Sequence, residues 1–371
     1  MKLLSIVGAR PQFVKVAVIA EALRSLPESE KIEHLLLHTG QHYDAQMSDS
    51  FFQQLRIAPP DFYLGIGSAS HGAQTGSMLA AIEAVLSGCR PDAVIVYGDT
   101  NSTLAGALAA AKMHVPVIHL EAGLRSFNRR MPEEINRRAT DHVSDMLLCP
   151  TTTAMRNARH EGLGDRSFLT GDVMLDLAMR YANHLQTSPA VAFKLSPPQG
   201  YALVTLHRAE NTDHPPRLAE FVKLLERMPL PVVLPMHPRL RTKLETGALR
   251  RLEGFSHVHL LEPCGYFEML ALERDARMIL TDSGGVQKEA YFLGVPCLTL
   301  REETEWEETL SGGWNRVMGT DPNRLLPVIE SLARGNGSMP QGRPDLSQFG
   351  SGRAGEQSVQ AILNLHRRQA A

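Results

Sequence analysis

The sequence predicts an α/β fold built from two doubly wound domains that face each other across a cleft. Short β-branched runs alternate with longer helical patterns, as in parallel sheets that are covered by helices on both faces. The alternation occurs in two series, which are separated by the Pro- and Ser-containing stretch 187–200. The length of 371 residues also suits two domains, at roughly 150 residues for each.

The first series starts at the N-terminus. Each expected strand is a short apolar run, and each expected helix is longer, with apolar residues at helical spacing. Pro132 supports a helix start. Backbone N–H groups in the first turn of a helix have no acceptor within the helix, so proline, which lacks an N–H, loses no hydrogen bond there. The expected strands are 3–7, 32–38, 93–97, 115–120 and 146–149, and the expected helices are 12–25, one starting near residue 45, 102–113 and 132–143.

The second series repeats this pattern, with strands at 201–206, 232–236, 257–261, 277–281 and 295–300 and helices at 215–227, 267–273 and 286–293. A Gly/Ser/Pro-rich connection, 335–355, leads into a last helix, 354–368, that we expect to pack against one of the domains. We place one domain at 1–175 plus 353–371 and the other at 176–352. Ligands of such sheets bind at the carboxyl ends of the strands, so we expect the site in the cleft.

Composition narrows the class of protein. The formal net charge of -2 does not indicate binding to nucleic acid or to a membrane surface, and no apolar run reaches the roughly 20 residues that a membrane span needs. Arg10-Pro11 ends the first apolar run too early for a signal peptide. The four cysteines form no CxxC pair, which favours buried, reduced thiols and a cytoplasmic enzyme. We expect no metal, since His257 and His259 have no suitably spaced partner ligands.

Polar clusters follow the expected strands of the first domain. Arg10 and Lys15 lie after the first strand, where cations near a helix start suit a phosphate, although an ordinary turn has the same composition. Asp99 follows another strand and either caps the next helix or points into the cleft; Asn101 and Ser102 are competing caps.

The stretch 119–138 holds three carboxylates and five arginines within twenty residues. Glu121 ends a strand and Glu133 opens a helix, so both acids can reach one cleft. Arg137 lies one helical turn after Glu133 and faces the same way. We expect Glu134 and Arg138 to point elsewhere and to be ordinary surface residues.

In the second domain, His207-Arg208-Ala-Glu210-Asn211 follows a strand, and His237 follows the next one. The segment Asp282-Ser-Gly-Gly-Val-Gln-Lys-Glu289 joins a strand to a helix. Its two glycines allow the backbone to approach an anion at the helix start, and Ser283 adds a donor. Glu289, further along the helix, is placed to accept hydrogen bonds from a ribose diol. The segment is neither a Walker A loop nor GxGxxG, which argues against a P-loop NTPase and a standard dinucleotide fold.

Together these motifs resemble the non-hydrolysing UDP-N-acetylglucosamine 2-epimerases. The matching segments occur in order over most of the chain, to about residue 320: Gly8-Ala-Arg-Pro, Gly98-Asp-Thr-Asn-Ser, His119-Leu-Glu-Ala-Gly-Leu-Arg125, Pro132-Glu-Glu-Ile-Asn-Arg137, His207-Arg-Ala-Glu-Asn211 and Asp282-Ser-Gly-Gly-Val-Gln287. The resemblance implies the GT-B architecture, with two Rossmann-like domains and a C-terminal helix that crosses back onto the first. It also implies elimination of UDP to a 2-acetamidoglucal and re-addition with the C2 proton on the opposite face, without any cofactor.

The resemblance assigns residue roles. It implies acid–base catalysis by Asp99, Glu121, Glu133 and His207, and it leaves open which acid is the base. The implied substrate and UDP contacts are Arg10, Lys15, Arg137, His237, Ser283, Gly284, Gly285 and Glu289. Some members of the family bind a second UDP-GlcNAc as an activator, for which the candidates here are Gln41, His42 and Arg208. The family is usually homodimeric and supplies surface polysaccharide synthesis.

Two departures from the family pattern bear on the substrate. Gln12 stands where the family usually has Glu, and Thr304-Glu-Trp-Glu-Glu308 replaces the common TERPE segment. These features resemble the branch that acts on UDP-2,3-diacetamido-2,3-dideoxy-glucuronate, whose extra carboxylate we expect Arg129 or Arg130 to bind. The alternatives are a hydrolysing epimerase, a GT-B glycosyltransferase and a non-enzymatic nucleotide-sugar sensor.

Overall fold

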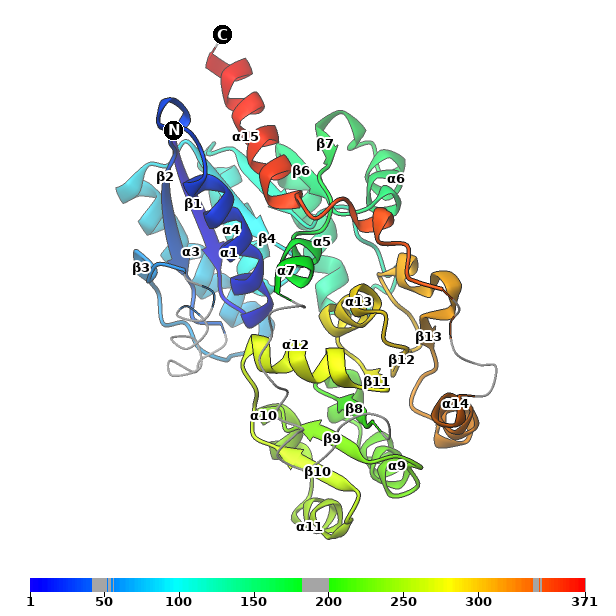
Figure 1. Ribbon diagram of the computed structural model, residues 1–371. Helices are drawn as coiled ribbons and strands as arrows, with labels where there is room; N and C mark the ends of the chain where they lie inside the picture. Colours follow the sequence, from blue (N-terminus) through cyan, green and yellow to red (C-terminus); the bar gives the residue numbers. More distant parts are fainter. Residues whose placement is uncertain are drawn as a thin grey trace. The chain divides into compact units, whose positions relative to one another are not determined.

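The computed structural model describes residues 1–41, 52, 55, 57–181, 200–335, 340 and 342–370. The chain forms two compact units, Met1–Leu177 with Leu346–Ala371, and Ala178–Asp345 (Figure 1). Each unit contains one all-parallel sheet with helices packed on it, which confirms the α/β class with two parallel sheets. The helix expected near residue 45 begins outside the described residues.

The first unit has a seven-stranded sheet in the order β3-β2-β1-β4-β5-β6-β7. The strands are β1 (Lys2–Val7), β2 (Glu33–His38), β3 (Phe62–Tyr63), β4 (Ala93–Tyr97), β5 (Val117–Leu120), β6 (Met146–Cys149) and β7 (Ser167–Leu169). Its helices are α1 (Arg10–Arg24), α3 (His71–Cys89), α4 (Asn101–Lys112), α5 (Pro132–Val143), α6 (Thr152–His160), α7 (Val173–Tyr181), which runs into the second unit, and α15 (Ala354–Ala370).

The C-terminal helix α15 belongs to the first unit although it follows the whole second unit in sequence. It packs against α1 (Figure 1). The backbone amides of Ala354 and Gly355 donate to the Asp176 carboxylate at 3.0 and 2.8 Å, which anchors the start of α15 at α7. A Cβ at Gly355 would lie 2.6 Å from Val18 Cγ1, so glycine permits the close approach of α15 to α1.

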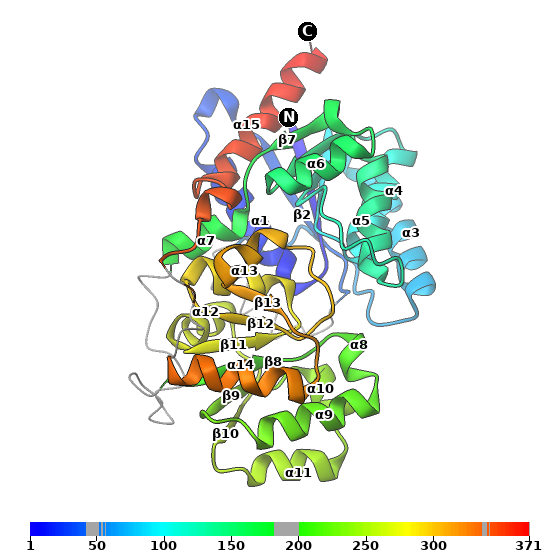
Figure 2. The ribbon, with the colours of Figure 1, turned by 90° about the vertical axis from the view of Figure 1, so that its right-hand side faces the viewer.

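The second unit has a six-stranded sheet in the order β10-β9-β8-β11-β12-β13. The strands are β8 (Ala202–Thr205), β9 (Val232–Pro235), β10 (Val258–Leu261), β11 (Met278–Thr281), β12 (Cys297–Thr299) and β13 (Asn315–Val317). Its helices are α8 (Ala209–Thr212), α9 (Pro215–Glu226), α10 (Pro238–Lys243), α11 (Thr246–Gly254), α12 (Tyr266–Asp275), α13 (Gly284–Leu293) and α14 (Pro322–Arg334) (Figure 2).

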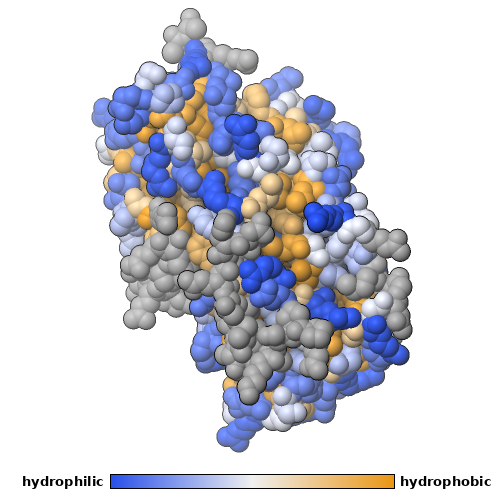
Figure 3. Space-filling model, in the orientation of Figure 1, coloured by the Kyte–Doolittle hydropathy of each residue, from blue (hydrophilic) through white to orange (hydrophobic). Residues whose placement is uncertain are grey.

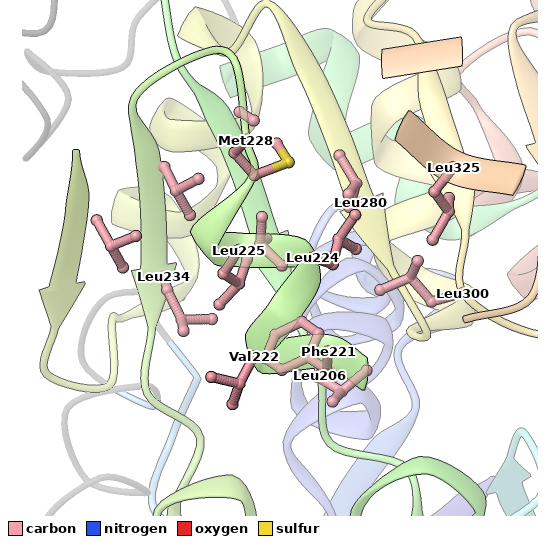
Figure 4. Close-up of a cluster of buried hydrophobic side chains, with 14 of the residues drawn as sticks. Leu206, Phe221, Val222, Leu224, Leu225, Met228, Leu234, Leu280, Leu300 and Leu325 are labelled. Carbon is pink, nitrogen blue, oxygen red and sulfur yellow. The ribbon is translucent and has the colours of Figure 1, made fainter. Parts of the chain in front are cut away.

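The packing of the second unit's core explains why its central strands are continuous apolar runs in the sequence. Side chains of β8, β9 and β11 pack against one face of α9, with Phe221, Leu224 and Leu225 at the centre (Figure 4). Leu325 and Ile329 of α14 complete this layer. Because the other face of the sheet is covered by α12 and α13, both faces of these strands are buried.

The structure contains elements that the sequence patterns did not predict. The most prominent is α3, which buries only Gln74, Met78, Ile82 and Leu86, spaced four residues apart. Its other positions are largely Gly, Ala and Ser, so no wide apolar stripe marks it, and glycine lowers helix propensity. Its packing against α4 holds it in place.

All four cysteines are free. Cys149 and Cys297 are buried as expected, whereas Cys89 and Cys264 are half-buried, contrary to the prediction of burial for all four. The described helices include none that is long and apolar enough to cross a membrane. On the face drawn in Figure 3, hydrophilic and apolar residues are interspersed.

Candidate functional site

The turn after β4 carries Asp99 and is shaped by its neighbours. Gly98 has φ of +61°, in the left-handed region that favours glycine. Thr100 caps α4, because its side chain accepts from Thr103 N; the expected caps Asn101 and Ser102 lie inside the helix instead. Asp99 is therefore not needed as a cap, and its carboxylate, 31% exposed, accepts from Arg137 Nη2 at 2.5 Å.

The end of β5 carries Glu121, which also has a left-handed backbone, with φ of +67°. Such a conformation is uncommon for a residue other than glycine and often marks a functional position. Its carboxylate forms an ion pair with Lys15, and the two side chains are only 10% and 6% exposed. A Cβ at Gly98 would lie 3.1 Å from Lys15 Nζ and 3.4 Å from Glu121 Oε1, so these three residues converge.

A buried polar network holds the turn at Gly98 in place. The ring of His119 lies between Gly98 O and Asp141 Oδ1, both at 2.7 Å, and the Asp141 carboxylate also binds Arg125 at 2.7 Å and Gly123 N at 3.1 Å. Burial by itself would raise the pKa of Asp141, but the hydrogen bond from His119 and the charges of His119 and Arg125 outweigh it and lower that pKa. Asp141 is not among the residues predicted from sequence, because nothing in its local pattern distinguishes it from a helix-surface residue.

Helix α5 contributes Glu133, Glu134 and Arg137. Glu133, in the first turn, is half-buried. The prediction that Glu134 is a surface residue is wrong: it is fully buried, accepts from Ser126 N at 2.9 Å, and lies 3.2 Å from Arg137 Nη1. The backbone turn before α5 needs an acceptor, and Glu134 supplies it. Arg137 thus lies between Asp99 and Glu134, which fixes its guanidinium inside the first unit.

The remaining first-unit candidates lie at helix starts. Arg10 is the first residue of α1 and is half-buried. Gln12 is buried; its Oε1 accepts from Gly8 N and Ala9 N at 2.7 and 3.0 Å, and its Nε2 donates to Tyr97 O at 2.7 Å. Gln12 therefore ties the α1 start to the β4 end.

Of the activator candidates, Gln41 accepts from the backbone N–H and hydroxyl of Ser102 at 3.0 and 2.7 Å, which places it at the first turn of α4. Arg208 lies in the second unit, and its Nε donates to Asp282 O at 2.9 Å. His42 lies outside the described residues.

In the second unit, Asp282 organises the polar cluster at the end of β11. Its buried carboxylate accepts from His207 N at 3.0 Å, Arg208 N at 2.9 Å and Asn211 Nδ2 at 3.0 Å. These bonds join the segment after β8 to the segment after β11, two strands that are neighbours in the sheet. The rings of His207 and His237 lie 5.2 Å apart, and the structure thus brings both predicted histidines together.

The Ser-Gly-Gly segment opens α13. Ser283 is the N-cap, with its Oγ accepting from Val286 N at 3.5 Å. Gly284 is buried and Gly285 is half-buried at the first two helical positions. A helix start with small residues presents free N–H groups and the positive end of the helix dipole, which suits an anion such as a diphosphate.

Two residues of the segment 304–308, which differs from the family's TERPE pattern, line this helix start. A Cβ at Gly284 would lie 2.8 Å from Glu305 Oε1 and 3.1 Å from Trp306 Nε1. Arg301 holds Glu305 at 2.7 Å, and Lys288 Nζ lies 3.8 Å from the centre of the Trp306 ring. Trp306 is therefore a buried packing residue here, with its face against a lysine.

The family resemblance implies that this helix start binds UDP. On that expectation Gly284→Ala should weaken the binding of UDP roughly tenfold or more, because Glu305, held by Arg301, has little room to yield to the new methyl group. Isothermal titration calorimetry with UDP measures the effect. Gly247→Ala is the matched control, since a Cβ at Gly247 meets no atom within 4 Å. Equal affinities for UDP in both variants would contradict this prediction.

Comparison with known proteins identifies the family to which the chain belongs. The family model described as UDP-N-acetylglucosamine 2-epimerase matches residues 24–363. The chain is 46% identical to UDP-2,3-diacetamido-2,3-dideoxy-D-glucuronate 2-epimerase of Pseudomonas aeruginosa, over 98% of this chain and 100% of that protein. It is 41% identical to UDP-N-acetylglucosamine 2-epimerase of Methanococcus maripaludis, over 96% and 97% of the two chains.

The fold is similar to that of a solved epimerase. The crystal structure of Methanocaldococcus jannaschii UDP-GlcNAc 2-epimerase in complex with UDP-GlcNAc and UDP matches with a TM-score of 0.89 and 40% identity, over 98% of this chain and 100% of that one. The epimerases of this group have a GT-B-like fold, as the family resemblance implied, and the two parallel sheets of this chain agree with it. The family model, the sequence identities and the shared fold show that the chain belongs to the UDP-N-acetylglucosamine 2-epimerase family.

Proposed function

We propose that this protein is a non-hydrolysing 2-epimerase of a UDP-2-acetamido sugar, of the UDP-GlcNAc to UDP-ManNAc type. The observation that supports it best is the pair of carboxylates at the ends of the adjacent strands β4 and β5, Asp99 and Glu121, each held by a buried cation. Removal of a weakly acidic C2 proton needs positioned carboxylates, and so does its return.

The proposed reaction balances without a cofactor. A carboxylate takes the C2 proton, the C1–O bond breaks, and UDP leaves with the electrons of that bond, which gives a 2-acetamidoglucal. The reverse step delivers a proton to the opposite face of C2 while UDP re-adds to C1. We assign proton transfer to Asp99, Glu121, Glu133 and His207, and we assign the binding of UDP to Arg10, His237, the Ser283–Gly285 helix start and Glu289.

Nuclear magnetic resonance of UDP-GlcNAc with the enzyme in deuterated water tests this proposal. We expect deuterium at C2 and the appearance of UDP-ManNAc without any acceptor. A glycosyltransferase or a sensor gives neither signal, and a hydrolysing epimerase releases free ManNAc with UDP.

The second candidate substrate is UDP-2,3-diacetamido-2,3-dideoxy-glucuronate. The 46% identity to the Pseudomonas aeruginosa enzyme of that name supports it. Arg129 and Arg130 also support it, because both are exposed just before α5 and so remain accessible to the extra carboxylate of this sugar.

We expect Arg129→Ala or Arg130→Ala to raise KM for the glucuronate sugar about tenfold, the effect of losing a charge-assisted hydrogen bond, and to leave KM for UDP-GlcNAc unchanged. Steady-state assays with both UDP-sugars measure this. Arg138→Ala is the control, since Arg138 is partly exposed on the same helix and lies 3.7 Å from Glu161. An unchanged KM for the glucuronate sugar in both variants would rule out this role.

Other expectations stay predictions: a homodimer, a cytoplasmic location, activation by a second UDP-GlcNAc and a role in polysaccharide synthesis. Light scattering tests the first. Activation by a second UDP-GlcNAc predicts that the initial rate depends on UDP-GlcNAc concentration in a non-hyperbolic way, which steady-state assays measure.

A further inference from the structure

His119 of β5 takes no part in the proposed proton transfers, yet its ring is fully buried between two oxygen atoms. Nε2 lies 2.7 Å from the carbonyl oxygen of Gly98, and Nδ1 lies 2.7 Å from Oδ1 of Asp141. Distances of this length are typical of charge-assisted hydrogen bonds.

These two partners decide how many protons the ring carries. A backbone carbonyl can only accept, so Nε2 donates to Gly98. Asp141 is an ionised acceptor, because its Oδ2 lies 2.7 Å from Arg125 Nη1 and accepts from Gly123 N at 3.1 Å, so Nδ1 donates as well. A histidine whose two ring nitrogens both donate is the positively charged imidazolium.

Opposite charges around the ring offset the cost of burying this cation. The side chains of Arg125 and Asp141 are both 0% exposed, and Glu161 lies 2.7 Å from Arg125 Nη2. With His119 the group therefore holds two cations and two anions. Cys149 also lies near Asp141, but burial raises the pKa of its thiol to about 12, so it adds no charge at neutral pH.

The carbonyl that His119 binds belongs to the peptide unit that joins Gly98 to Asp99. Because glycine permits a wide range of backbone angles, a contact to this peptide adds to the precision with which the next residue is held. The carbonyl of Asp99 itself accepts from Asn136 Nδ2 at 2.9 Å, and its carboxylate binds Arg137. The contact with His119 holds the same residue from the Gly98 side.

We propose that His119 is a positively charged positioning residue, which links the buried carboxylate of Asp141 to the Gly98 carbonyl. It thereby holds Asp99 in the orientation that proton transfer needs. A charged donor fixes a carbonyl more firmly than a neutral one, which explains the use of an imidazolium here. The inference rests on the proposed function, in which Asp99 exchanges a proton with C2 of the sugar.

Two amide variants separate the two hydrogen bonds. In His119→Asn the amide nitrogen takes the place of Nδ1 and can donate to Asp141, but the side chain is too short to reach the Gly98 carbonyl. In His119→Gln the longer side chain places its amide nitrogen near the position of Nε2, where it can donate to Gly98. His114→Asn, at an exposed position before β5, is the matched control.

We expect His119→Asn to lower kcat for C2 deuterium exchange about 100-fold, the effect of misplacing a reacting group by about 1 Å. His119→Gln and His114→Asn should stay within about tenfold of wild type, since both keep a donor on Gly98. Kd for UDP should be unchanged in all three, because the Ser283–Gly285 helix start lies in the second unit. A wild-type kcat in folded His119→Asn, or an equal loss in His119→Gln, overturns the inference.

A second measurement decides the question even where His119→Asn does not fold. Nitrogen-15 NMR of histidine-labelled wild type at neutral pH should show a ring with protons on both nitrogens, and this signal should be absent from His119→Gln. A His119 ring with a single proton overturns the inference. Failure of wild type to exchange deuterium at C2 would instead refute the proposed function, and the charge on His119 would still be measured by NMR.

Discussion

Glu121→Gln is expected to lower the rate of C2 deuterium exchange by about 10²- to 10⁴-fold, the usual contribution of a general acid or base. The amide keeps the size of the side chain but cannot take or return a proton. It also removes the negative charge opposite Lys15, which is nearly buried. NMR exchange in deuterated water with UDP-GlcNAc or the glucuronate sugar measures the effect.

The control for this experiment is Glu83→Gln, since Glu83 is exposed on α3 in the same unit. Circular dichroism and thermal unfolding should show that Glu121→Gln remains folded. Exchange within threefold of wild type in a folded Glu121→Gln protein would exclude Glu121 from proton transfer.

Asp141→Asn is expected to reduce the free energy of unfolding by about 3–5 kcal/mol, the cost of removing one partner from a buried ion pair. The change leaves His119 and Arg125 facing an amide in the protein interior. It should also loosen the turn that holds Gly98, and therefore Asp99. Urea unfolding measures the loss, with Asp165→Asn, an exposed aspartate, as the control.

The dependence on pH gives an independent check of Asp141. Its pKa in the folded protein is lowered, so its contribution is fully present above the ordinary aspartate value of about 3.9 and is lost as pH falls through the lower, folded value. Between neutral pH and strong acid, wild type should therefore lose more stability than Asp141→Asn. Parallel stability curves for the two proteins would contradict this account.

Much of the fold follows from local patterns. The central strands of the two sheets are buried on both faces, so each is a continuous apolar run that sequence alone identifies, as in β4 and β11. Helix α3 escaped prediction because packing against α4, and not its own composition, stabilises it. Polar residues at strand ends could be predicted because they interrupt apolar runs in the sequence. The same positions place them at the carboxyl edge of a parallel sheet, where ligands bind.

The sequence by itself determined the α/β class, the two sheets and the polar residues that follow their strands, because these depend on periodicity and on neighbours along the chain. Only the tertiary structure decided the partners of those residues: Glu121 with Lys15, Asp99 with Arg137, and Asp282 with the His207 turn. The partners of each pair lie between 38 and 106 positions apart in the sequence. Their charge, burial and proton therefore depend on how helices and strands pack, which no local pattern contains.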